Sequence, residues 1–72
     1  MTVNPNELMI GDKVLVINQP NKYGMLRGTV GEVTTFNQVR ARIQTKFPNG
    51  TWFASWVDLH NLTKLPKEVD NV

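Results

Sequence analysis

Residues 38–47 read QVRARIQTKF, and apolar and polar side chains alternate along this stretch. Successive side chains of a β-strand point to opposite faces of the sheet. One face then carries Val39, Ala41, Ile43, Thr45 and Phe47. The other face carries Gln38, Arg40, Arg42, Gln44 and Lys46. This alternation predicts a strand that packs one face on a core and leaves the other face in water.

Shorter runs rich in β-forming residues predict four further strands, at about residues 12–18, 28–35, 51–56 and 61–65. The spacing of three between Val30 and Val33 breaks strict alternation and predicts a bulge near Gly31. Pro48-Asn49-Gly50 predicts a hairpin turn of type I′, because Asn-Gly tolerates positive φ values. Residues 57–60 predict a short 3-10 turn before the last strand.

The N-terminal residues predict a single helical turn. Asn4 is placed as its N-cap and Pro5 as its first residue, and Gly11 ends it within two turns. We expect Leu8 and Ile10 to cover one end of the folded core. The chain then divides into an N-terminal turn that packs on the barrel (1–10), the barrel (11–65) and a flexible tail (66–72).

Length and composition predict one small domain that is stabilised by its core alone. The 72 residues contain no cysteine and one histidine, so neither a disulfide framework nor a Cys/His zinc site is expected. The formal net charge of +2 permits a polyanionic partner but argues only weakly for one. We expect no signal peptide, no membrane span and a cytoplasmic location.

Five short strands, a long irregular loop after the first and a 3-10 turn before the last predict an all-β fold of the SH3-like barrel type. The residues also carry a family resemblance. Residues 11–16 (GDKVLV), residues 28–33 (GTVGEV), Gly50 and Asp58-Leu59 resemble the KOW-type barrels of ribosomal and transcription-elongation proteins. In that pattern Gly28 would be the central glycine of the motif.

A second resemblance is to the small photosystem I reaction-centre subunit IV and to other short barrels of photosynthetic complexes. It is carried by Gly11-x-Lys13-Val14, Tyr23, Gly28-Thr29-Val30 and Phe53-Ala54. Both resemblances imply the fold. Neither implies a particular partner, because turn glycines and core valines are what these families share.

Catalysis is not expected. A nucleophile and base pair would need His60 beside Ser55, with Asp58 to orient the imidazole. The acidic residues are scattered, and the sequence contains no nucleotide-binding or zinc motif. We therefore predict a chain that is not an enzyme and has no cofactor and no metal.

A basic stripe is the first candidate binding site. Its residues are Lys22, Arg27, Arg40, Arg42 and Lys46. Side chains two residues apart on one face of a strand lie about 7 Å apart, which suits contacts to the phosphates of RNA or single-stranded DNA. The alternative is that these residues are ordinary solubilising charge on an exposed strand face.

An aromatic strand is the second candidate. Trp52 and Trp56 share one parity and Phe53 has the other, so either the tryptophans or Phe53 must be exposed. Exposed aromatic residues mark partner surfaces. The alternative is that twist and a bulge bury most of them.

These patterns predict a non-catalytic binding module. The first hypothesis is a protein-interaction or assembly subunit that docks through Tyr23, Trp52, Phe53 and Trp56. The alternative is a KOW-like nucleic-acid-binding domain that uses the basic stripe. A homo-oligomer through the tryptophans is a further alternative.

Overall fold

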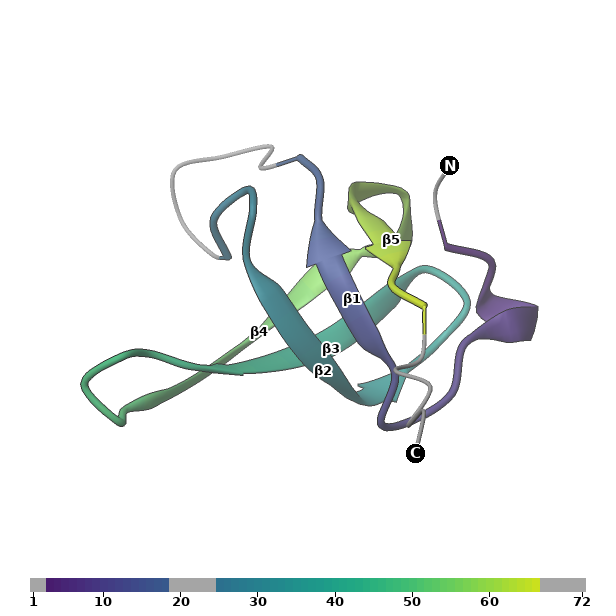
Figure 1. The fold of residues 1–72 in the computed structure, drawn as a ribbon. Coiled ribbons are helices and arrows are strands. Elements are labelled where there is room, and N and C mark those ends of the chain that lie inside the picture. Colours follow the sequence, from purple (N-terminus) through teal and green to yellow (C-terminus); the bar gives the residue numbers. More distant parts are fainter. Residues whose placement is uncertain (1–2, 19–24, 67–72) are drawn as a thin grey trace, which may run out of the picture.

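The computed structural model describes residues 3–18 and 25–66. Its five strands are β1 (Lys13–Val16), β2 (Val30–Phe36), β3 (Arg40–Lys46), β4 (Trp52–Asp58) and β5 (Leu62–Lys64). Two 3-10 turns, η1 (Pro5–Glu7) and η2 (Leu59–Asn61), precede β1 and β5. Every strand pairing is antiparallel, and the order across the sheet is β4-β3-β2-β1-β5 (Figure 1).

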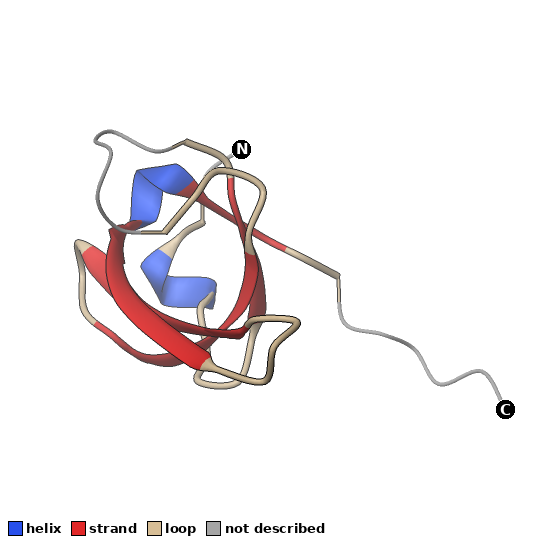
Figure 2. Ribbon diagram, turned by 90° about the vertical axis from the view of Figure 1, so that its left-hand side faces the viewer, coloured by secondary structure: helices blue, strands red, loops and turns tan. Residues whose placement is uncertain are grey.

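The sheet is strongly curved and wraps around its own interior (Figure 2). The inner face carries Val14 and Val16 of β1, Val33 of β2, and Ala41 and Ile43 of β3, all at most 1% exposed. The two edge strands, β4 and β5, are not paired with each other within the described residues. The fold is thus a mostly-β domain, as the alternation in residues 38–47 predicts, with no closure of the sheet detected.

The N-terminal turn forms as the sequence predicts. Asn4 caps η1, because its side-chain Oδ1 accepts a hydrogen bond from the Asn6 backbone N–H at 2.9 Å. Leu8 is buried, as predicted, but the prediction for Ile10 is wrong, because its side chain is 69% exposed. Ile10 lies in a turn closed by the hydrogen bond from Asp12 N–H to the Met9 carbonyl, and this turn directs it outward.

The predicted bulge near Gly31 is also wrong. Val30 and Val33 lie on opposite faces of a regular ladder, so their spacing of three requires no bulge. The register shift falls between Val33 and Thr35, where Thr34 is the extra residue. Gly31 has a different role: a Cβ atom there would collide with the side chain of Ile43 and lie 3.0 Å from the Gln44 carbonyl oxygen.

The β3–β4 hairpin has a three-residue loop and not the predicted type I′ turn. Gly50 donates to the Phe47 carbonyl at 2.9 Å, and Phe47 donates to the Thr51 carbonyl at 2.8 Å. Only Gly50 has a positive φ here, at +89°, while Asn49 uses its side chain to accept from Thr51 N–H at 2.9 Å. A glycine in this conformation at the end of the loop is the common three-residue solution.

Candidate binding face

Two tryptophans on β4 point away from the core. Trp52 is 60% exposed and Trp56 is 50% exposed. The inward positions of β4 belong to Phe53, which packs partly buried against the core, and to Val57, which is buried. The parity argument from the sequence is thereby decided: the tryptophans are exposed and Phe53 points inward.

Each tryptophan lies directly opposite a basic residue of β3. The register pairs Trp52 with Lys46 and Trp56 with Arg42. Lys46 Nζ lies 5.6 Å from the centre of the Trp52 ring, within the range of a cation–π interaction. Cross-strand neighbours on one face are close enough to contact the same ligand. We call the exposed side of β3 and β4 that carries these four residues the outer face.

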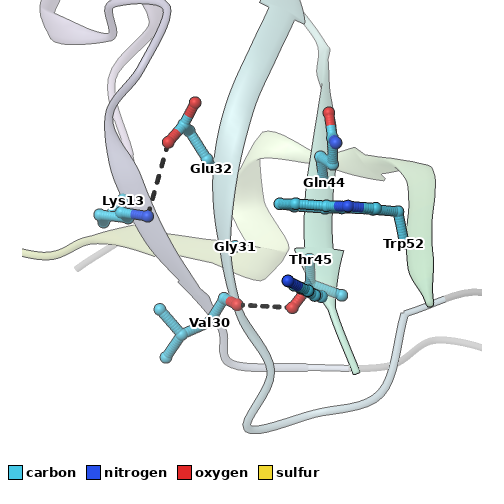
Figure 3. A pocket seen from close by; sticks show the side chains of 8 residues that line it. Lys13, Val30, Gly31, Glu32, Gln44, Thr45 and Trp52 are labelled. Carbon is cyan, nitrogen blue, oxygen red and sulfur yellow. Dashed lines mark hydrogen bonds and ion pairs between the residues drawn. The ribbon is translucent and has the colours of Figure 1, made fainter. Parts of the chain in front are cut away.

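A shallow groove of about 300 Å³ continues the outer face across β2 to β1. It is lined by Lys13, Val30, Gly31, Glu32, Gln44, Thr45, Lys46 and Trp52. Figure 3 shows the Trp52 indole extending over the sheet beside Gln44. The groove therefore has one aromatic wall and a floor of mixed polarity.

The charges on this side of the sheet compensate one another in part. Arg40 Nε lies 2.7 Å from Asp58 Oδ1, and Lys13 Nζ lies 3.5 Å from Glu32 Oε1. Arg42 donates from Nη1 to Thr34 Oγ1 at 3.2 Å. The three residues of the basic stripe that lie on β3 share one face of the sheet, but one of them, Arg40, is already paired with a carboxylate.

The remaining sequence candidates are not part of the outer face as described. Arg27 is exposed in the turn before β2, whose backbone is held by the hydrogen bond from Gly28 N–H to the Val16 carbonyl at 2.7 Å. Lys22 and Tyr23 lie outside the described residues. The structure thus brings together Arg40, Arg42, Lys46, Trp52 and Trp56.

A smaller apolar pocket of about 170 Å³ lies on the other side of the hairpin. Met25, Leu26, Thr29, Thr45, Phe47 and Phe53 line it. Phe47 and Phe53 stack with ring centres 5.8 Å apart. Phe53, a sequence candidate for protein binding, therefore belongs to this pocket and not to the tryptophan face.

Of the catalytic candidates from the sequence, His60 and Asp58 lie near each other on the surface. His60 has a side chain 72% exposed, and its Nε2 lies 4.0 Å from Asp58 Oδ2. Asp58 is held by Arg40 on its other oxygen. Within residues 3–18 and 25–66, no cluster of three or more His, Cys, Asp or Glu side chains could bind a metal.

Sequence reasoning missed Lys13, Glu32 and Gln44 as groove residues. Their position depends on the pairing of β1 with β2 and of β2 with β3, which sets Glu32 between Lys13 and Gln44. A strand pattern reports which residues share a face of one strand. It does not report which strand lies alongside, so no local signal could have revealed the groove.

No helix in the described part of the chain is long and apolar enough to cross a membrane. Comparison of the chain with protein-family models, with curated proteins and with solved structures found no match.

Proposed function

We propose that this chain is a non-catalytic protein-binding module with an SH3-like barrel fold, and that it docks a protein partner on the outer face. The fold proposal is supported by the strand order β4-β3-β2-β1-β5 and by η2, which connects the two edge strands at one end. The curvature of the sheet is consistent with a barrel.

The observation that carries the proposed function is the exposure of Trp52 and Trp56. Aromatic residues bury a large apolar area, and a small domain that leaves two tryptophans in water forgoes much stabilisation. Tryptophan is also the residue most enriched among interface hot spots. A partner surface accounts for both facts, because partner binding removes the indole rings from water.

The charge distribution favours a protein partner over a polyanion. Lys13 with Glu32 and Arg40 with Asp58 form ion pairs of 3.5 Å and 2.7 Å. Phosphate-driven binding relies on several uncompensated cations, and here only Arg42 and Lys46 remain without a carboxylate partner on this part of the described surface. A protein partner has both charge signs to offer and fits such a face better.

The test is partner capture from extract of the source cell, with wild-type chain and the Trp52→Ala/Trp56→Ala double variant as baits. We expect a protein retained by the wild type and lost by the double variant. Val39→Ala is the matched control, since Val39 is an equally exposed apolar residue, at 62%, outside the outer face. Equal retention by all three baits would refute the proposed face.

A second candidate, binding of single-stranded nucleic acid, is favoured by one observation. Each exposed tryptophan has a cation directly across the ladder, Lys46 for Trp52 and Arg42 for Trp56. A stacking platform beside a phosphate contact is how proteins bind single strands. The candidate predicts a random oligonucleotide affinity that falls steeply with salt, by a log–log slope of roughly −0.7 per phosphate contact. A fluorescence titration at two salt concentrations measures this slope, and no binding at low salt excludes the candidate.

A further inference from the structure

The backbone of β4 has one edge that no described strand covers. The β3–β4 ladder is bracketed by hydrogen bonds from Phe47 N–H to the Thr51 carbonyl and from Leu59 N–H to the Val39 carbonyl. In an antiparallel ladder, bonded and non-bonded residues alternate. Counting inward from both ends shows that the backbone groups of the odd-numbered β4 residues form the hydrogen bonds to β3. The N–H and C=O groups of Trp52, Ala54 and Trp56 therefore point to the open edge.

This edge lacks the features that normally prevent strand pairing. Edge strands are usually short, or carry lysine, proline or a bulge. β5, the opposite edge, has three residues, ends with Lys64 and is soon followed by Pro66. β4 has seven residues, and its only charged residue is Asp58 at its end, which is paired with Arg40. The β3–β4 hairpin also projects beyond the rest of the sheet (Figure 1).

The edge sequence is nearly symmetric about Ala54. Residues 52–56 read WFASW, with a tryptophan two positions to each side of the alanine. A second copy of β4 running antiparallel, with Ala54 opposite Ala54, sets Trp52 of one copy opposite Trp56 of the other, twice. Trp52, Ala54 and Trp56 are also the residues whose backbone N–H and C=O groups point to the open edge, so they can form the hydrogen bonds to the second copy. Aromatic pairs are among the favourable cross-strand combinations.

We propose that this chain forms a two-fold homodimer by antiparallel pairing of β4 with β4 of a second copy, centred on Ala54. Such an interface uses the same patch on both copies and closes on itself. The proposal rests on the proposed function in one respect, that Trp52 and Trp56 are interface residues. The dimer proposal adds that a second copy of β4 pairs with the open edge beside these tryptophans. The outer faces of the two copies then form one continuous surface.

The available area makes this dimer weak. An aromatic side chain buries about 150–250 Å² in full, and Trp52 and Trp56 are only half to three-fifths exposed. Even complete burial of the exposed part of these four rings contributes only roughly 330–550 Å², well below the ~1,200 Å² at the lower end of stable interfaces. Backbone hydrogen bonds between the two β4 strands add to this contribution, and we expect a weak, transient association.

Charge at the two-fold axis tests the register. In this dimer Ala54→Lys places two like charges opposite each other, and so does Ala54→Glu. Sedimentation velocity over a concentration series is expected to show a wild-type dimer, at least tenfold weaker association for either variant, and recovery when the two variants are mixed. Ile10→Lys and Ile10→Glu are the matched controls, since Ile10 is 69% exposed and precedes β1, three strands away from β4.

Circular dichroism checks that every variant is folded. A second variant blocks the pairing without adding charge. Ala54→Pro removes an N–H that points to the open edge, and both tryptophans stay in place. It is expected to abolish the dimer and to leave the circular dichroism spectrum unchanged. A wild type that remains monomeric at 1 mM, or a dimer that neither charge nor proline weakens, overturns the dimer. A wild type that dimerises but whose capture of a partner does not depend on Trp52 and Trp56 overturns the proposed function instead.

Discussion

A single buried carboxylate, that of Asp12, connects three segments of the chain. Asp12 is 6% exposed, and its Oδ2 accepts from the Met9 backbone N–H at 2.8 Å. The same oxygen lies 3.2 Å from Lys64 Nζ of β5, and Lys64 also donates to the Glu7 carbonyl at 2.9 Å. The N-terminal turn, the start of β1 and the edge strand β5 are thereby held together by one side chain.

Removal of this carboxylate is expected to destabilise the fold. Asp12→Ala removes the carboxylate that accepts from the Met9 N–H and pairs with Lys64, and hydrogen bonds to a charged group contribute about 1.5–3 kcal/mol. Urea unfolding followed by circular dichroism measures the loss. Glu32→Ala is the control, because both side chains of the Lys13–Glu32 pair are more than half exposed and such pairs contribute about 0–1 kcal/mol. Equal losses for the two variants would contradict the role given to Asp12.

At the scale of the element, the β3–β4 hairpin determines how far the outer face extends. β3 and β4 have seven residues each and pair over their whole length. Their loop relies on Gly50 at φ +89°. A residue with a side chain adopts this conformation only with strain, and asparagine adopts it more readily than alanine.

Substitutions at Gly50 are therefore expected to differ in a defined order. Gly50→Ala is predicted to lower the unfolding free energy by about 1–2 kcal/mol, and Gly50→Asn by less. The space around a Cβ atom at Gly50 is open, so backbone conformation and not a clash decides the result. Thermal denaturation of the two variants beside the wild type measures the order. An alanine variant as stable as the wild type would exclude the strained conformation.

The elements also show what a sequence can predict. Alternation in residues 40–46 identified β3 and its buried residues, Ala41 and Ile43, because side-chain parity is a local property of one strand. The ends of the same pattern failed: Val39 and Phe47 are 62% and 44% exposed, since they lie beyond the strand that covers the core. The bulge was misplaced to Gly31 because its position depends on the register with β3, which is a long-range property.

The candidate site divides in the same way. The alternation in β4 predicts that the tryptophans and Phe53 face opposite sides of the sheet, and this prediction is confirmed. Which side is the inside depends on the whole sheet, because only the packed core determines which parity is buried. The partial neutralisation of the basic stripe by Asp58 also required the β3–β4 register, which sets Arg40 opposite Asp58.

At the scale of the whole molecule, the core is complete without the tryptophans. The buried side chains come from every strand of the sheet and from the segments around Val3, Leu8, Met25 and Leu59. A chain of 72 residues has little stability in reserve. Two large rings lie outside this core, and we propose that they serve binding and not folding.

That separation of folding from binding is the central claim, and one comparison of unfolding free energies tests it. Urea unfolding by circular dichroism is to be measured for Trp52→Ala/Trp56→Ala and for Phe53→Ala, each against the wild type. We expect the double tryptophan variant to stay within about 1 kcal/mol of the wild type, as exposed substitutions do. Phe53→Ala is expected to lose about 2–3 kcal/mol, somewhat less than a fully buried phenylalanine. A double tryptophan variant that loses as much as Phe53→Ala would place the indole rings in the core and contradict the account.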